Sequence, residues 1–375
     1  MHGRDWTRWP AELRHPSSPA VAQARSALAG RVAFHAWLQN LCDGQLAAVR
    51  AASAGMPIGI VQDLAVGIDP GGADGWLLQD VLAAGVRVGA PPDAFNQLGQ
   101  DWGLATWRPD RLAAAGYAPY RDLVRAMLRH AGGLRVDHVA GLWRLWWVPP
   151  GGTAADGTYV RYDSAAMVGI LALEASRAGA VVVGEDLGTV LPEVTAGLAA
   201  RNMLGCEVLW FARDDDGEFV PPASWPVDAL ATVSTHDLPT AAGYLTGEHV
   251  RVRSSLGQLV RPEAEEQALA DLEREKLVTL LRAEGFVGPD PSLDDLILGL
   301  HRMLAATPST LVAVSPYDAV GEVRQPNLPG TMDEYPNWRM PLAATLEEIA
   351  TDPRMHAVAA VLADRKPATA REANR

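Results

Sequence analysis

The sequence predicts an α/β protein built on parallel strands, and three observations lead to this prediction. Short apolar runs recur along the 375-residue chain, and each is closed by polar residues. Helical segments separate these runs, and such alternation is typical of a parallel sheet. Several runs end in an acidic residue, at the place where a (β/α)₈ barrel keeps its active site. The length suits either two ordinary domains or one α/β barrel, and we predict a (β/α)₈ TIM-type barrel.

The strands and helices follow from these patterns. Asp163 is a candidate N-cap of a helix over 164–178 that ends before Gly179, and a second helix begins at Pro262. A closed barrel needs eight strands. We find about six, all predicted to be buried, so the predicted barrel is incomplete; the six apolar runs are 57–63, 133–138, 180–186, 206–212, 230–237 and 309–315.

The interval between the first two strands is too long for a plain crossover. Its first half is rich in Gly, Pro, Asn and Asp, so we predict a long inserted loop over 68–116. Composition predicts a disordered or irregular segment at 1–30, one barrel domain over 31–345, and a C-terminal helix with a disordered tail at 346–375.

Charge and cysteine content narrow the possible partners. The net charge is −13 and the pI is about 5.1, which argues against nucleic acid or an anionic membrane surface as a partner. Cys42 and Cys206 lie far apart, so the sequence supports neither a disulfide framework nor a thiolate metal site. No apolar stretch approaches the ~20 residues that span a bilayer. We expect a soluble, cytoplasmic protein of undetermined oligomeric state.

Four acidic residues close their apolar runs: Asp63, Asp137, Glu185 and Asp237. Each alone would more often cap a helix or pair with an arginine, but together they indicate a site. Arg135 lies two residues before Asp137, so both side chains point the same way and the guanidinium keeps the aspartate ionised, as a nucleophile requires.

Glu185 follows an apolar run, so desolvation and neighbouring carboxylates should raise its pKa and suit it to donate a proton. One ionised and one protonated carboxyl group are what retaining glycosidic chemistry requires. Core packing and a sugar-binding surface both remain open for three aromatic residues after the Asp137 strand: Trp143, Trp146 and Trp147.

The remaining polar candidates divide into two groups. His138 and His236 each adjoin a candidate catalytic aspartate, which favours sugar contacts over a structural role. Glu322, Asp333 and Glu334 are predicted to be solvated charges.

Four ordered motifs carry a family resemblance: "LRVDHVAG", "VVGEDLG", "LATVSTHDLPT" and "QPNLPGTMDEYPNWR". Together they resemble the 4-alpha-glucanotransferases, also called amylomaltases or disproportionating enzymes, of the alpha-amylase clan. The resemblance runs from about residue 31 to 342. Leu238 and Pro239 depart from the Asn-Asp that many members have, which concerns only the contacts next to Asp237. The family's first barrel strands are not found, so we expect a truncated form.

The resemblance implies a transferase that moves α-1,4-glucan segments to the 4-hydroxyl of an acceptor glucan or glucose, with no organic cofactor and no required metal. It implies that Asp137 is the nucleophile, Glu185 the general acid/base and Asp237 the stabilising carboxylate. The segment "PPDAFNQLGQDWG" resembles the family's loop over the acceptor subsites. The implied sugar-binding or supporting residues are Asp63, Arg135, His138, His236, Asn327, Gln100 and Trp102.

Two alternatives stay open. A metal-dependent barrel hydrolase would also gather Asp, His and Glu at strand ends. A non-catalytic remnant of the same family would keep the motifs and only bind glucan. Metal analysis separates the first from a glucanotransferase, and activity on maltotriose separates the second.

Overall fold

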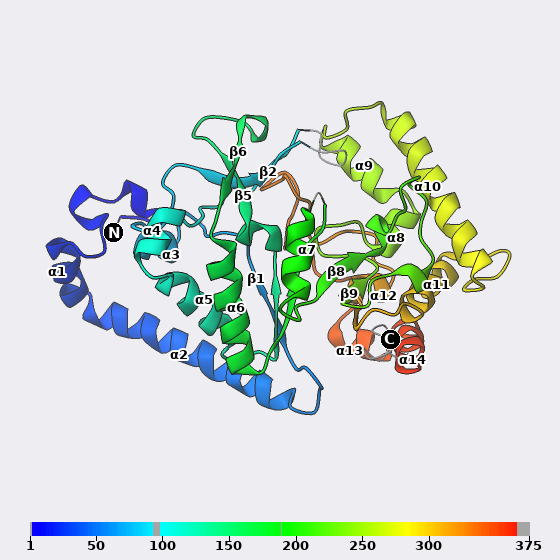
Figure 1. The fold of residues 1–375 in the computed structure, drawn as a ribbon, viewed down its shortest axis with the longest axis horizontal. Coiled ribbons are helices and arrows are strands. Elements are labelled where there is room, and N and C mark those ends of the chain that lie inside the picture. Colours follow the sequence, from blue (N-terminus) through cyan, green and yellow to red (C-terminus); the bar gives the residue numbers. More distant parts are fainter. Residues whose placement is uncertain (1, 93–97, 189, 366–375) are drawn as a thin grey trace. The chain divides into compact units, whose positions relative to one another are not determined.

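The computed structural model describes residues 2–92, 98–188 and 190–365, and the chain divides into two compact units. The first unit comprises Met1–Asp186 and Val190–Met203, and the second comprises Leu187–Thr189 and Leu204–Arg375. Each unit contains a three-stranded parallel sheet with helices, as the ribbon in Figure 1 shows. The predicted α/β class is therefore correct.

The parallel sheet of the first unit has the order β1-β4-β7, formed by Val61–Leu64, Gly133–Val136 and Val181–Gly184. β4 lies in the middle, and Leu134 and Val136 pack into a core with helices α5 (Ala118–Leu128), α6 (Ser164–Ala178) and α7 (Pro192–Ala199). The predicted caps of α6 are confirmed. The Asp163 carboxylate accepts the Ala166 N–H, and Gly179 adopts a left-handed φ of 64°.

The first unit also contains an antiparallel sheet that the sequence analysis missed. Its order is β3-β2-β5-β6, formed by Gln100–Asp101, Arg87–Ala90, Arg144–Val148 and Thr158–Arg161. The predicted inserted loop 68–116 therefore contains two strands and the short helices α3 (Ala73–Leu77) and α4 (Pro109–Ala114). A Cβ on Gly89 of β2 would lie 2.0 Å from the Gln100 carbonyl oxygen, so only glycine permits this close pairing with β3.

Two of the tryptophans that follow β4 serve packing. Trp146 donates its indole N–H to the Ala154 carbonyl at 2.9 Å and meets the Tyr159 ring edge-on, with ring centroids 4.9 Å apart. Trp143 packs against the core, and a Cβ on Gly197 of α7 would lie 2.5 Å from its ring. The geometry favours core packing for both.

Residues 2–30, for which the sequence predicts a disordered or irregular segment, contain η1 (Trp6–Arg8), η2 (Ala11–Leu13) and α1 (Pro19–Ala27). The 24-residue helix α2 (Ala29–Ala52) follows and has no buried residue. Asp43 attaches α2 to the unit by ion pairs with His130 at 2.7 Å and Arg129 at 3.2 Å.

The side of α2 opposite Asp43 is apolar and exposed. Helical spacing places five apolar side chains on that side, and each is between 39% and 53% exposed. We call this surface the α2 apolar face; it consists of Phe34, Trp37, Leu38, Leu41 and Val49.

The parallel sheet of the second unit has the order β10-β9-β8, formed by Leu311–Ala313, Ala229–Thr232 and Gly205–Val208. The predicted helix after Pro262 is confirmed as α10 (Glu263–Ala283), and Leu277 and Leu281 anchor it in the core. The remaining helices are α8 (Ala241–Leu245), α9 (Glu248–Ser255), α11 (Leu293–Ala305), α12 (Pro316–Ala319), α13 (Leu346–Thr351) and α14 (Pro353–Ala363). Most of the tail predicted to be disordered, 366–375, lies outside the described residues.

Each of the six predicted strand positions contains a parallel strand, three in each unit. The prediction that all six are buried is wrong for the edge strands β1 and β10, because Val61 of β1 is 45% exposed and every residue of β10 is only half-buried. The strands are also shorter than predicted: β9 ends at Thr232, so Asp237 lies on the following loop. Among the described residues, no helix has the length and apolar character that crossing a membrane requires.

Candidate active site

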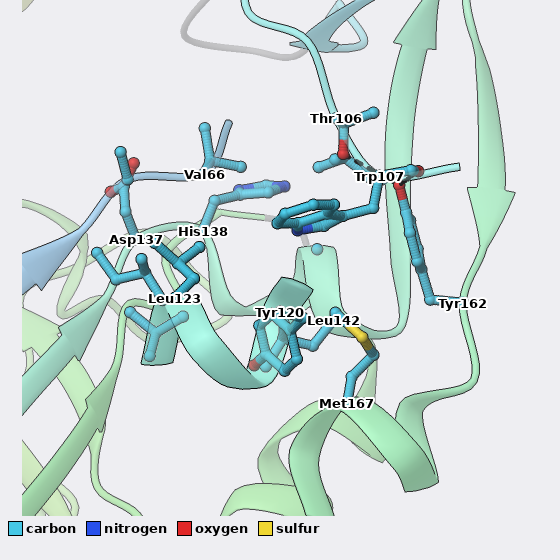
Figure 2. Close-up of a pocket in the computed structure, with 15 residues that line it drawn as sticks. Val66, Thr106, Trp107, Tyr120, Leu123, Asp137, His138, Leu142, Tyr162 and Met167 are labelled. Atoms are coloured by element: carbon cyan, nitrogen blue, oxygen red, sulfur yellow. Dashed lines mark hydrogen bonds between the residues drawn. The ribbon is translucent and has the colours of Figure 1, made fainter. Parts of the chain in front are cut away.

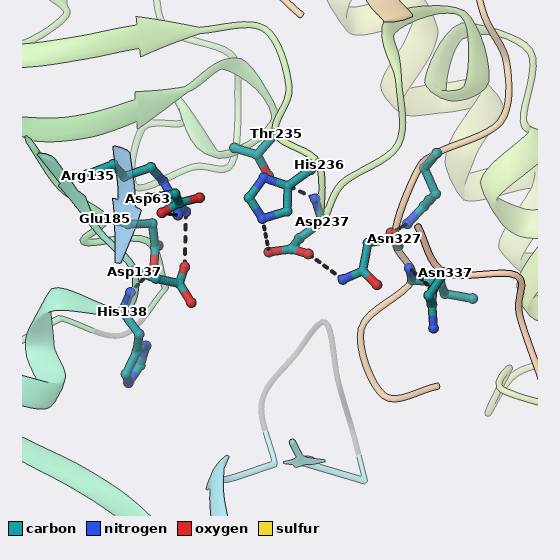
Figure 3. Close-up of polar contacts among 12 residues, drawn as sticks. Asp63, Arg135, Asp137, His138, Glu185, Thr235, His236, Asp237, Asn327 and Asn337 are labelled. Atoms are coloured by element: carbon teal, nitrogen blue, oxygen red, sulfur yellow. Dashed lines mark hydrogen bonds and ion pairs between the residues drawn. The ribbon is translucent and has the colours of Figure 1, made fainter. Parts of the chain in front are cut away.

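In the first unit, Arg135 on β4 lies between two aspartates (Figure 3). Its guanidinium binds Asp63 Oδ1 at 2.6 Å and Asp137 Oδ1 at 3.1 Å, and its side chain is only 16% exposed. Burial alone would lower the pKa of Arg135, but the charges of Asp63, Asp137 and Glu185 raise it above its ordinary value. The predicted pairing of Arg135 with Asp137 is therefore present.

Glu185 follows β7 as Asp137 follows β4. The backbone N–H of Glu185 donates to the Val136 carbonyl, and its own carbonyl accepts the Val139 N–H, each at 2.9 Å. The Glu185 carboxylate is buried and accepts the His138 backbone N–H at 2.8 Å. His138 has a left-handed φ of 46°, which turns the chain so that this N–H meets Glu185.

The His138 side chain is held among aromatic residues. Burial lowers its pKa to about 4, so the imidazole is neutral at neutral pH. Its ring centroid is 5.4 Å from that of Trp102, and the Trp102 indole N–H donates to Gln100 Oε1 at 3.1 Å. Trp102 therefore lies beside His138 and Gln100 is bonded to Trp102, whereas residues 93–97 of the same loop lie outside the described residues.

Asp137 and His138 also line a cavity of about 50 Å³. Figure 2 shows the His138 imidazole and the Trp107 indole on its walls. The Tyr162 hydroxyl donates to the Trp107 carbonyl at 2.8 Å and contacts the Thr106 hydroxyl at 3.1 Å. These bonds fix the wall that faces His138.

In the second unit, Asp237 interacts with the neighbouring side chains of His236 and Asn327 (Figure 3). Asn327 Nδ2 donates to Asp237 Oδ1 at 2.6 Å, and His236 Nε2 lies 3.2 Å from Asp237 Oδ2. The Asn327 backbone N–H also donates to the His236 carbonyl at 3.2 Å. The predicted residues Asp237, His236 and Asn327 are thus brought together.

A buried carboxylate that sequence reasoning missed ties both ends of the loop carrying Asp237. Asp318 of α12 is completely buried; one oxygen accepts the Ser234 hydroxyl at 2.5 Å and the other accepts the Ala241 N–H at 2.7 Å. Burial raises the pKa of Asp318 to about 6. Its segment, "SPYDAVGE", carries no signal of this role, because the bonds join residues far apart in sequence.

The sequence predicts no role for two residues of the fourth motif, Trp338 and Asn337, that lie near the Asp237 loop. Trp338 has its ring centroid 5.1 Å from that of His236. Asn337 precedes it and accepts the Leu328 N–H at 2.8 Å. The sequence signal for Trp338 is that it belongs to the same motif as the predicted site residue Asn327.

The prediction of solvated charges is wrong for Glu322. Its side chain is 7% exposed and forms a bidentate pair with Arg324, at 2.8 and 2.6 Å, which lowers its pKa. Asp333 and Glu334 are exposed, as predicted. Across residues 2–92, 98–188 and 190–365, no group of three or more His, Cys, Asp and Glu side chains has an arrangement that could hold a metal ion.

Comparison with known proteins gives a consistent family. The 4-alpha-glucanotransferase family profile matches residues 1–346. A 4-alpha-glucanotransferase from Mycobacterium tuberculosis is 53% identical over 367 residues, covering 94% of this chain and 51% of the relative. The corresponding protein of Haemophilus influenzae is 36% identical, covering 91% of this chain and 50% of the relative.

Solved structures agree. The amylomaltase from Corynebacterium glutamicum superposes with a TM-score of 0.83 at 45% identity, covering 88% of this chain and 50% of that chain. An amylomaltase from Streptococcus agalactiae, solved in complex with acarbose, shares the fold with a TM-score of 0.75 at 18% identity, covering 95% of this chain and 68% of that chain. The present chain spans about half the length of the curated relatives it matches. It belongs to the 4-alpha-glucanotransferase family.

Proposed function

We propose that this chain transfers segments of α-1,4-glucans to the 4-hydroxyl of acceptor glucans or glucose, with retention of configuration. The contrast between Asp137 and Glu185 carries the proposal. Asp137 is paired with a cation, which favours the ionised form that a nucleophile needs. Glu185 is buried, and burial opposes ionisation of a carboxyl group, as an acid needs, whereas the Arg135 charge and the His138 N–H act in the opposite direction.

The first half of the reaction breaks the donor bond. Glu185 gives its proton to the glycosidic oxygen while Asp137 attacks the anomeric carbon, so the reducing-end part of the donor leaves as an alcohol and the rest of the donor forms a glucosyl ester on Asp137. Asp237 stabilises the positive charge that develops on the sugar ring.

The second half re-forms the bond. Glu185, now a carboxylate, takes the proton of the acceptor 4-hydroxyl; that oxygen attacks the anomeric carbon and releases Asp137. Gln100 and Trp102 bind the acceptor and limit access of water. The other sugar contacts are Asp63, Arg135, His138, His236 and Asn327. The mechanism assigns no step to a metal or an organic cofactor.

We also propose that the six parallel strands are six of the eight in a (β/α)₈ barrel. The edge positions of β1 and β10 support this, because a closed barrel has no edge strand. The exposed α2 apolar face supports the incomplete barrel as well. Barrel helices bury their apolar side against strands, and the six strands leave this side of α2 uncovered. Neither Cys42 nor Cys206 forms a disulfide within the described residues, which is consistent with the proposed cytoplasmic location.

Product analysis after incubation with maltotriose tests the activity. Glucose together with a ladder of longer maltooligosaccharides indicates transfer, whereas reducing sugar without a ladder indicates hydrolysis. Activity that a chelator removes would support the metal-dependent hydrolase instead. Binding of maltotriose without products would identify a glucan-binding fragment.

Size-exclusion chromatography tests the incomplete barrel. Exposed strand edges and the α2 apolar face should make the isolated 375-residue chain self-associate and should weaken its activity, because a displacement of ~1 Å at the site can cost about a hundredfold in rate. A well-behaved, fully active monomer would contradict the incomplete barrel.

A further inference from the structure

Trp338 combines solvent exposure with two features that an ordinary surface tryptophan lacks. It is 65% exposed, so its indole faces solvent. Its backbone φ is +59°, in the left-handed region that bulky residues avoid. Its ring lies 5.1 Å from that of His236, which neighbours Asp237. Single exposed apolar residues need no explanation, but a strained one beside a candidate site does.

The strained conformation is imposed by the surrounding loop. The Trp338 N–H donates to the Pro326 carbonyl at 2.9 Å. Asn337 accepts the Leu328 N–H at 2.8 Å and donates to the Thr331 hydroxyl at 2.8 Å and to its carbonyl at 3.0 Å. Backbone strain of this kind persists only where neighbouring bonds over-determine it, and such positions cluster at ligand sites.

The same loop contributes to the Asp237 cluster. Asn327 starts the loop, and its side chain donates to Asp237 while its backbone N–H donates to the His236 carbonyl. The loop therefore contributes two groups next to the His236–Asp237 pair: a polar amide bound to Asp237 and an exposed indole beside His236.

This combination suits a sugar ring. A pyranose has a face of C–H groups and a rim of hydroxyls; a flat indole covers the face, and carboxylate, amide and imidazole groups bind the rim. We infer that Trp338 is a stacking platform for one glucose ring of a maltooligosaccharide beside Asp237. The inference rests on the proposed function, which supplies the substrate class, and adds a binding residue to it.

Two variants separate stacking from packing. Trp338→Gly removes the indole and adopts a φ of +59° without strain. Trp338→Phe keeps an aromatic ring. Trp37→Ala is the matched control, because Trp37 is 53% exposed on α2 and belongs to neither candidate cluster. Isothermal titration calorimetry with maltotriose gives Kd, and thermal unfolding gives Tm.

We expect Trp338→Gly to weaken maltotriose binding by roughly tenfold or more, with Tm unchanged or raised, and Trp338→Phe to weaken binding by less than about threefold. The control should leave Kd unchanged. An unchanged Kd in Trp338→Gly, with or without a lower Tm, would overturn the inference, as would a wild-type chain that binds no maltotriose at about 10 mM.

The maltotriose product assay on the wild-type chain keeps the two proposals apart. Transfer by the wild type together with an unchanged Kd in Trp338→Gly leaves the proposed function standing and removes the platform. Loss of binding in Trp338→Gly with no transfer by the wild type supports the platform and contradicts the activity of this chain.

Discussion

The two units hold their candidate aspartates by different means. In the first unit a buried cation, Arg135, lies between Asp63 and Asp137. In the second unit, the Asp237 carboxylate accepts a hydrogen bond from the Asn327 amide and contacts the His236 imidazole, and the Asp237 backbone N–H donates to the Thr235 hydroxyl. A cation compensates the aspartate charge directly, whereas an amide donor orients the carboxylate with little change in net charge. The first arrangement suits an attacking carboxylate, and the second suits one that responds to charge on a substrate.

The largest expected effect is on catalysis in the first unit. Asp137→Asn or Glu185→Gln should lower turnover of maltotriose by several orders of magnitude, roughly 10⁴-fold, because the covalent and proton-transfer steps fail separately. Circular dichroism should show that both variants fold. Turnover near that of the wild type would remove both role assignments, and loss of a bound metal in the same variants would favour the hydrolase.

The next effect compares the two ways of holding an aspartate. Arg135→Met leaves neighbouring carboxylates without their shared cation and should lower the free energy of unfolding by about 3–5 kcal/mol. Asn327→Ala removes a single hydrogen bond to Asp237 and should cost only about 1–3 kcal/mol. Urea denaturation measures both. Equal losses would show that the cation has no special part in the first unit.

The pH dependence of stability should have opposite signs in the two units. The folded-state pKa of His138 is lowered from 6.5 to about 4, so between pH 4 and 6.5 the unfolded state binds a proton that the folded state does not. The stability of the folded state therefore decreases as the pH falls below 6.5. The folded-state pKa of Asp318 is raised from 3.8 to about 6, so its contribution to stability is lost as pH rises through this window. Each contribution is at most about 3–3.5 kcal/mol.

Single variants should reveal these opposing effects. Asn tolerates the left-handed backbone at position 138. As the pH rises from 4 to 6.5, the free energy of unfolding of His138→Asn should decrease relative to that of the wild type, and that of Asp318→Asn should increase relative to it. Urea midpoints measured across this range test the prediction. Differences from wild type that do not change with pH would contradict it.

The smallest effect concerns the acceptor. Trp102→Ala should weaken acceptor binding more than donor cleavage, because stacking surface is lost while the carboxylates keep their partners. Water should then compete better, and the ratio of transfer product to free reducing sugar should fall severalfold, by about 1 kcal/mol in relative barrier. Matching ratios for variant and wild type would exclude Trp102 from the acceptor site.

The features that the sequence predicts well depend on short-range or repeated patterns of residues. The six strands, the caps of α6 and the pairing of Arg135 with Asp137 all follow from spacing within a few residues. The antiparallel sheet was missed because β2 and β3 are short and their partner β5 lies more than 40 residues further along the chain.

The missed residues share one cause. Asp318 binds Ser234 across 84 residues, and Trp338 reaches His236 across about 100 residues. Composition offers no cue to such contacts. Glu322 was assigned to solvent for the same reason, although its partner Arg324 lies only two residues away, because its burial comes from the surrounding fold. Motifs located the candidate aspartates and the Arg135 partner of Asp137, whereas the partners that come from distant segments are identified only by the structure.

Helix α2 contains a native cysteine that can be labelled to detect whether this helix is covered. Cys42 is exposed on this helix and Cys206 is buried in the second unit, so a thiol reagent should label position 42 selectively under native conditions. Helical spacing puts Cys42 at the border of the α2 apolar face. An environment-sensitive fluorophore at Cys42 would therefore brighten or shift in colour when any chain, including another copy of this one, covers that helix, without any engineered cysteine.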